Sequence, residues 1–141
     1  MNKDAFNRIF QDVRAFHVAA GQPCPTEPTF QEPGLVSRRS AWIDSELQEL
    51  DDATTDENLT EQVDAYLDII YFGIGGLVEC GVLPGELWDL VAKANYPGKL
   101  WPDGTMHKNE QGKVLKPAGW VAPDAEIAAA INRQRQEKLL G

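Results

Sequence analysis

The sequence contains little cysteine, and this limits how the chain can be stabilised. Two of its 141 residues are cysteines, Cys24 and Cys80, and they stand far apart with no C-x-x-C spacing. Two distant cysteines do not make a disulfide framework, and they predict free thiols in a reducing compartment. We therefore expect a cytoplasmic protein.

Positive charge and long apolar runs are also scarce. The chain has 13 Lys and Arg against 22 Asp and Glu, a formal net charge of −9. Such a chain lacks the basic surface that binds nucleic-acid backbones or anionic membranes, so we expect neither as a partner. The longest apolar run lies within residues 69–78, contains three glycines and is too short to cross a bilayer. The N-terminus is charged and does not resemble a signal peptide. A small anion can still bind, through a metal ion or a local basic patch.

Apolar residues recur at helical spacing in most of the chain, which predicts an all-α fold. The length suits one domain, residues 1–141, built as a bundle of about five helices. Prolines 23, 25, 28 and 33 predict an extended linker after the first helix, and turn sequences within residues 96–121 predict a short hairpin or irregular segment there. The expected helices span about residues 4–20, 36–53, 59–80, 84–95 and 123–139.

The second and third helices place carboxylates where a surface helix would not. On a helical wheel of about 100° per residue, Glu46 falls inside the apolar arc of its helix and Glu49 at the edge of that arc. Glu61, Asp64 and Asp68 share one face of the next helix, because residues three and four apart are neighbours on a helix surface. That helix is apolar almost all round from Ile69 onward, so we expect it to be central and buried.

Inward-facing carboxylates on two consecutive helices point to a metal site. Buried carboxylates must be paired, protonated or bound to a metal. Ligands that are all oxygen favour Mg²⁺, with Mn²⁺ as a possible substitute. Glu61 has a second interpretation, because Asn58 stands three residues before it and the two could form a capping box.

The carboxylate pattern resembles that of a known superfamily. Glu46-Leu47-Gln48-Glu49 and the segment from Asp64 to Tyr71 are similar to the signature of the all-α nucleoside triphosphate pyrophosphohydrolases, which include MazG, dimeric dUTPase and phosphoribosyl-ATP pyrophosphohydrolase. Residues 11–17, 99–104 and 112–116 resemble the phosphoribosyl-ATP branch. One departure is Ala65, which stands three residues before Asp68 where the signature has Glu. We favour Asp64 and Asp68 as the second pair; the other register uses Glu61 and Asp64.

The resemblance implies a reaction and a set of residues. It implies Mg²⁺-dependent hydrolysis of a (deoxy)nucleoside triphosphate to monophosphate and pyrophosphate, with house-cleaning of dUTP or non-standard nucleotides as the preferred role. The alternatives are phosphoribosyl-ATP hydrolysis in histidine biosynthesis and a catalytically dead oligomerisation or binding module. The family assembles as homodimers or homotetramers. The implied metal ligands are Glu46, Glu49, Asp64 and Asp68, the candidate general bases are Glu49 and Glu61, and the implied substrate contacts are Lys93, Asn95, Lys99 and Trp101.

Overall fold

The computed structural model describes residues 2–140 and contains five helices and no strand within them. The helices are α1 (Lys3–Ala20), α2 (Pro33–Thr55), α3 (Leu59–Cys80), α4 (Gly85–Asn95) and α5 (Asp124–Glu137). The predicted all-α class is therefore confirmed. Residues 96–123 are irregular and include an antiparallel bridge between Lys108 and Val114. Cys24 and Cys80 form no disulfide, as expected.

Local sequence signals account for several of the helix ends. Gly21 and Gly81 follow α1 and α3 in the left-handed conformation, with φ of 68° and 66°, which glycine adopts without strain. Asn58 caps α3 by accepting a hydrogen bond from the Glu61 N–H at 3.1 Å. The prediction was wrong for Pro33, which begins α2 instead of extending the linker. Proline is tolerated in the first helical turn, because the N–H it lacks has no partner there.

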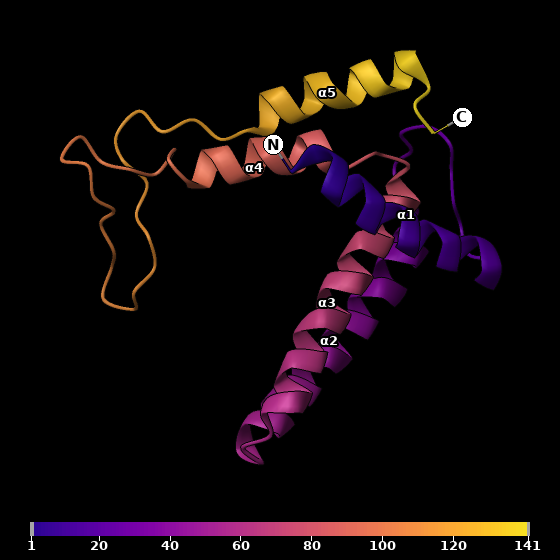
Figure 1. The fold of residues 1–141 in the computed structure, drawn as a ribbon, viewed down its shortest axis with the longest axis horizontal. Helices are drawn as coiled ribbons and strands as arrows, with labels where there is room; N and C mark the ends of the chain where they lie inside the picture. Colours follow the sequence, from indigo (N-terminus) through magenta and orange to yellow (C-terminus); the bar gives the residue numbers. More distant parts are fainter. Residues whose placement is uncertain (1, 141) are drawn as a thin grey trace.

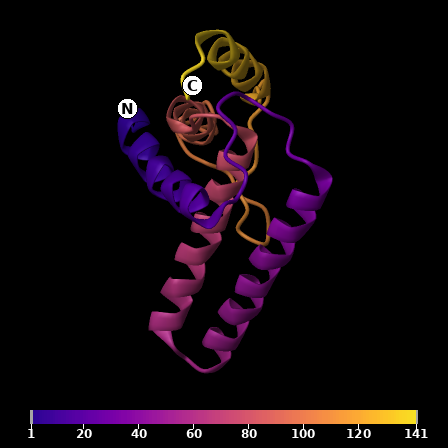
Figure 2. The same cartoon turned by 90° about the vertical axis from the view of Figure 1, so that its right-hand side faces the viewer.

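Helices α2 and α3 form a long antiparallel hairpin that projects from a head containing α1, α4, α5 and the C-terminal end of α3 (Figure 1). Figure 2 shows α1 crossing α3 where the hairpin enters the head. At this crossing Phe10 and Val13 of α1 pack with Ile74 and Val78 of α3. The irregular segment hangs from the far end of α4, apart from the hairpin (Figure 1).

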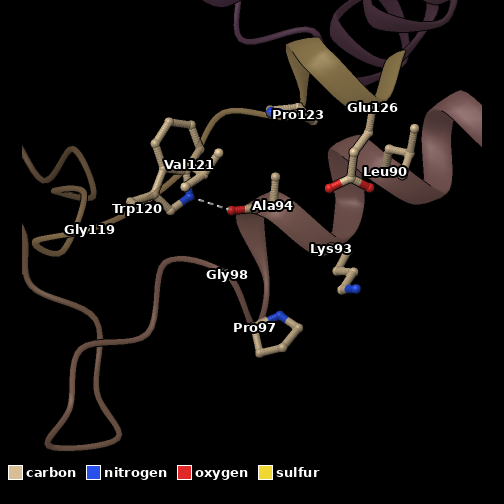
Figure 3. Close-up of a pocket in the computed structure, with 10 residues that line it drawn as sticks. All are labelled: Leu90, Lys93, Ala94, Pro97, Gly98, Gly119, Trp120, Val121, Pro123 and Glu126. Atoms are coloured by element: carbon tan, nitrogen blue, oxygen red, sulfur yellow. Dashed lines mark hydrogen bonds between the residues drawn. The ribbon is translucent and has the colours of Figure 1, made fainter. Parts of the chain in front are cut away.

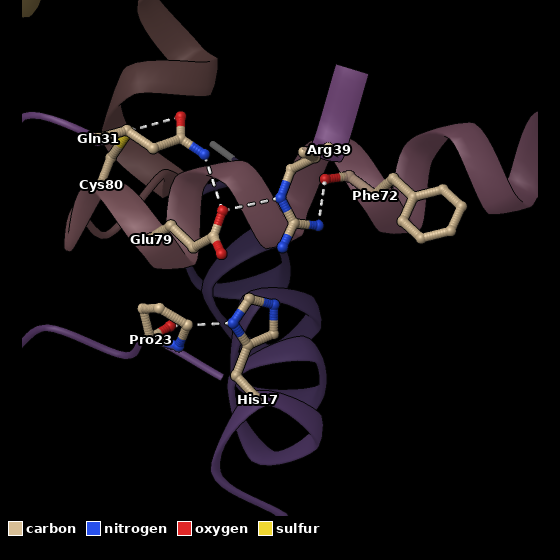
Figure 4. Close-up of polar contacts among 7 residues, drawn as sticks. All are labelled: His17, Pro23, Gln31, Arg39, Phe72, Glu79 and Cys80. Atoms are coloured by element: carbon tan, nitrogen blue, oxygen red, sulfur yellow. Dashed lines mark hydrogen bonds and ion pairs between the residues drawn. The ribbon is translucent and has the colours of Figure 1, made fainter. Parts of the chain in front are cut away.

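A buried ion pair joins the two helices of the hairpin inside the head (Figure 4). Arg39 Nε of α2 donates to Glu79 Oε1 of α3 at 2.9 Å, and Gln31 Nε2 donates to the same oxygen at 2.7 Å. Burial alone would raise the pKa of Glu79, but these hydrogen bonds and the charge of Arg39 hold it below its usual value. The ion pair therefore fixes how α2 lies against α3.

Glycine at position 75 leaves room for this ion pair. A Cβ added to Gly75 would lie 2.4 Å from Arg39 Nη1 and 3.0 Å from His17 Nε2, whereas one added to Gly73 would meet nothing within 4 Å. We expect Gly75→Ala to lower the free energy of unfolding by about 1–3 kcal/mol, because the guanidinium must move. Gly73→Ala, the matched control on the same helix, should raise it by about 0.5–1 kcal/mol. Urea unfolding of both variants checks this; equal effects would contradict it.

The expectation that α3 is central and buried from Ile69 onward was wrong for Ile70, and apolar residues before Ile69 are exposed as well. Ile74, Gly75 and Val78 are buried in the head, but Val63, Tyr66, Leu67 and Ile70 are 48%, 57%, 58% and 55% exposed. Along this part of α3 the neighbouring helix is α2, and one neighbour covers one side of a helix. The four residues follow the i, i+3, i+4, i+7 spacing of a single stripe, called here the apolar stripe. No described helix is both long enough and apolar enough to cross a bilayer.

Candidate functional site

Three carboxylates meet on the inner side of the hairpin. Glu46 and Glu49 of α2 and Asp68 of α3 each bring one oxygen within 4.8 Å of the others, and we call these residues the acidic cluster. Glu46 and Asp68 are half-buried, while Glu49 is exposed. The spacing of three on α2 places both glutamates on one face, and the antiparallel packing of α3 brings Asp68 to that face. Three oxygens of like charge thus share one small volume.

The acidic cluster is electrostatically unfavourable without a cation. Burial raises the pKa of Glu46 from 4.5 to about 7, assisted by a hydrogen bond with Glu49 and the charges of Glu49, Asp68 and Asp64. Burial also raises the pKa of Asp68, with further contributions from Asp64 and Glu49. Glu46 Oε2 is buried without a hydrogen-bond partner. A divalent cation at this place would offset the surplus negative charge and give the unpaired Glu46 oxygen a partner. Ligands that are all oxygen suit Mg²⁺ or Mn²⁺. These residues therefore fit a metal ion.

The pKa of Glu46 predicts how stability depends on pH in the metal-free protein. Folded Glu46 keeps its proton up to about pH 7, whereas the unfolded chain releases it near 4.5. The folded state binds more protons in this window, so the free energy of unfolding should fall as pH rises through it. Asp68 contributes with the same sign. Urea unfolding in the presence of a chelator measures this, and Glu46→Gln should flatten the dependence. A wild-type stability that rises across the same window would contradict the prediction.

The other predicted carboxylates lie in an adjoining cavity. Glu49, Asp52, Glu61 and Asp64 line a space of about 350 Å³. Glu49 therefore belongs to the acidic cluster and also lines this cavity. Asn58 caps α3 as predicted, but its own N–H donates to the Ala53 carbonyl, so the Glu61 carboxylate does not complete a capping box. Sequence reasoning missed Asp52, although it extends the Glu-x-x-Glu spacing by three more residues.

The predicted substrate contacts lie elsewhere in the chain, at the end of α4 and in the irregular segment (Figure 1). Lys99 Nζ donates to Asn95 Oδ1 at 2.8 Å. Trp101 stacks on His107 with ring centroids 4.0 Å apart, so one face of its ring is covered. Lys93 lines a cavity of about 320 Å³ beside Trp120 (Figure 3). Within one protomer the structure does not bring these four residues to the acidic cluster.

These contacts belong to a basic segment within an acidic protein. Residues 93–120, called here the basic segment, contain five lysines against Asp103 and Glu110. Lys99 and Lys116 lie over the Trp120 ring, at 5.5 and 4.7 Å from its centroid. Residues 40–92, which hold the acidic cluster, contain no lysine or arginine. The acidic cluster and the basic segment are thus separated along the chain and in space.

This chain is similar in sequence and in fold to known proteins. A family model described as phosphoribosyl-ATP pyrophosphohydrolase matches residues 13–95, from within α1 to the end of α4. The crystal structure of a candidate NTP pyrophosphohydrolase from Exiguobacterium sp. 255-15 is 30% identical in sequence, with a TM-score of 0.51, covering 92% of this chain and 96% of that chain. No curated protein matches the sequence.

Proposed function

This chain belongs to the phosphoribosyl-ATP pyrophosphohydrolase family and is a nucleotide pyrophosphohydrolase; from that premise we propose that it hydrolyses a (deoxy)nucleoside triphosphate to monophosphate and pyrophosphate with Mg²⁺ at the acidic cluster. The observation that carries the proposal is the meeting of three carboxylate oxygens within 4.8 Å, one of the three residues having an unpaired buried oxygen. Mn²⁺ is the expected substitute.

The carboxylates are proposed to divide between holding the metal and accepting a proton. Glu46, Glu49 and Asp68 hold the metal, with Asp64 added from the adjoining cavity. When bound there, the metal supplies charge neutralisation for the phosphate oxygens and lowers the pKa of a bound water. Glu61 lines the same cavity as Glu49, and either residue can accept the proton of the attacking water. The register with Asp64 and Asp68 as the second pair is the one we propose, because Asp68 lies with Glu46 and Glu49.

Residues 40–92 contain no lysine or arginine, and of the two arginines in α2, Arg39 is buried in its ion pair with Glu79 and Arg38 lies over the Trp42 ring, so the positive charge for the phosphates is proposed to come from elsewhere. We propose that the apolar stripe packs against a second copy, giving a homodimer or homotetramer. Lys93, Asn95 and Lys99 from the basic segment of a neighbouring subunit then contact the substrate, with Trp101 near them. An exposed stripe of four large apolar residues supports this assembly, because isolated soluble chains rarely leave such surfaces uncovered.

The preferred substrates are dUTP and non-standard nucleotides. Phosphoribosyl-ATP is the second candidate, because the matching family model carries that activity in its description. The test is release of pyrophosphate and monophosphate from a panel containing dUTP, the standard nucleotides and phosphoribosyl-ATP, with Mg²⁺, with Mn²⁺ and with chelator. We expect metal-dependent release, fastest with dUTP or a non-standard nucleotide. No release from any substrate by folded protein would refute the proposal and favour a binding module.

A further inference from the structure

We infer that Lys116 joins Lys99 at the ring of Trp120 to form a binding site for the diphosphate part of the substrate and for the pyrophosphate product; this inference rests on the proposed function. In this site the two lysines contact phosphate oxygens, and Trp120 is a positioning residue that holds the lysines in place. The matching family model ends at residue 95 and therefore does not include Lys116 or Trp120.

The Trp120 ring gathers two cations from different parts of the basic segment. Lys116 Nζ lies 4.7 Å from the centroid of the ring, and Lys99 Nζ lies 5.5 Å from it. The face of a tryptophan ring attracts an ammonium group within about 6 Å of its centroid, because the face carries partial negative charge. One side chain thus brings together two positive charges that the sequence keeps apart.

Backbone structure fixes where the ring and Lys116 lie. Trp120 Nε1 donates to the Ala94 carbonyl at 2.8 Å, which joins the ring to the end of α4 (Figure 3). The Trp120 N–H donates to the Pro117 carbonyl at 3.1 Å and closes a tight turn, in which Gly119 has a φ of 80° that glycine adopts without strain. Pro117 is buried. Lys116 therefore enters a fixed turn whose other end carries the ring.

The two lysines are not needed to cap α4. Lysines near the end of a helix often bind its last carbonyls, which lack partners within the helix. Here these carbonyls already have other donors. The carbonyls of Ala92, Lys93, Ala94 and Asn95 accept, in that order, from the Tyr96 N–H, the Gly98 N–H, Trp120 Nε1 and the Lys99 N–H. Lys99 Nζ gives one of its three donors to Asn95 Oδ1. The remaining ammonium donors can therefore bind a ligand.

No carboxylate of the described part of the chain forms an ion pair with Lys99 or Lys116. Asp103, an acidic residue of the basic segment, accepts hydrogen bonds from its own turn. Glu126 lines the cavity beside Trp120, but Figure 3 shows it across that cavity from the ring. Two ammonium groups around one ring repel each other, and an anion that contacts both offsets this repulsion. Lys116 is exposed, so such an anion can reach it.

The chemistry of the site suits a diphosphate. Ammonium groups bind phosphate oxygens as point charges and recognise neither a base nor a sugar. A diphosphate carries several negative oxygens and can contact both lysines at once. In the proposed assembly the metal at the acidic cluster of one subunit holds the phosphate that is attacked. The lysine pair of the neighbouring subunit then holds the two phosphates that leave as pyrophosphate.

Calorimetric binding of inorganic pyrophosphate in the presence of Mg²⁺ tests the site without nucleotide hydrolysis. Lys116→Gln should weaken the affinity by about tenfold or more, because a charged hydrogen bond is lost. Lys113→Gln is the matched control: it makes the same change of charge in the same segment, at an exposed lysine that does not lie over the ring. It should bind like the wild type. Equal losses in the two variants, or a wild type that binds no pyrophosphate, would overturn the inference.

Two substitutions of Trp120 test its positioning role. Trp120→Leu removes the aromatic face and should weaken pyrophosphate binding by about tenfold, whereas Trp120→Phe keeps a ring and should retain most of the affinity. A general structural defect would not be rescued by phenylalanine, which also lacks the Nε1 donor to Ala94. An equal loss in both variants would overturn the role of the ring. Lys116→Gln still tests the site if Trp120→Leu fails to fold.

The inference and the proposed function can fail separately. If the wild type hydrolyses nucleotides and Lys116→Gln binds pyrophosphate as the wild type does, the site is wrong and the proposed function stands. If the wild type hydrolyses no nucleotide but Lys116→Gln weakens pyrophosphate binding while Lys113→Gln does not, the site stands and the proposed function is wrong. In an active enzyme Lys116→Gln should also raise KM for the triphosphate by about tenfold.

Discussion

Replacing Glu49 by glutamine is expected to lower kcat/KM for triphosphate hydrolysis by about a thousandfold, the factor that corresponds to about 4 kcal/mol of lost transition-state stabilisation. Glu49 supplies an oxygen to the acidic cluster and also lines the cavity shared with Glu61 and Asp64. Its loss therefore weakens metal binding and alters the position of the attacking water. Asp68→Asn should have an effect of similar size, because Asp68 is the residue through which α3 supplies an oxygen to the acidic cluster. Pyrophosphate release under saturating Mg²⁺ measures both.

Asp44→Asn is the matched control for these variants. Asp44 lies on the same helix and is exposed, but it belongs to neither the acidic cluster nor the adjoining cavity. It should keep the activity of the wild type, and thermal unfolding should show that all three variants are folded. Hydrolysis that persists in Glu49→Gln and Asp68→Asn would remove the site assignment while leaving the family membership unaffected.

Placing two lysines in the apolar stripe, by Leu67→Lys with Ile70→Lys, is expected to convert the assembled protein to monomers. Each lysine would have to lose its hydration in an apolar interface, which is strongly unfavourable. Activity per chain should then fall by about a hundredfold or more, since the phosphates lose charged hydrogen bonds from the neighbouring subunit's basic segment. Light scattering during size-exclusion chromatography gives the mass, and the pyrophosphate assay gives the activity.

Phe30→Lys separates this effect from a general change in surface charge. Phe30 is 90% exposed and lies in the linker between α1 and α2, away from the apolar stripe. The variant should keep both assembly and activity. A wild-type protein that is active as a monomer, or a double variant that stays assembled and active, would contradict the proposed completion of the site by a second copy.

The helices could be predicted because their signals are local. Gly21 and Gly81 end helices by backbone conformation, and apolar spacing marks which residues share a face. Spacing does not say what covers that face, which is why the exposure of Ile70 was not foreseen. Pro33 was misplaced because the same residue suits both a linker and a first helical turn.

The candidate site could be predicted within each helix but not between helices. Residue spacing places Glu46 beside Glu49, and Asp64 beside Asp68. Which of these meet across the hairpin depends on the offset of α2 against α3, and the structure brings Asp68, but not Asp64, into the acidic cluster. The Arg39–Glu79 pair joins residues 40 apart, so no local pattern indicates it. The distance of Lys93 and Lys99 from the acidic cluster depends on the path of the chain and, in our proposal, on assembly.

The most direct test of the central claim is to locate Mn²⁺ by anomalous diffraction from crystals of the protein soaked with this ion. The account predicts an anomalous peak within coordination distance of the Glu46, Glu49 and Asp68 carboxylates, and no peak there in the Glu49→Gln variant. Wild-type crystals with no peak at the acidic cluster, in a protein that still hydrolyses triphosphates with Mn²⁺, would contradict the claim that these carboxylates hold the metal.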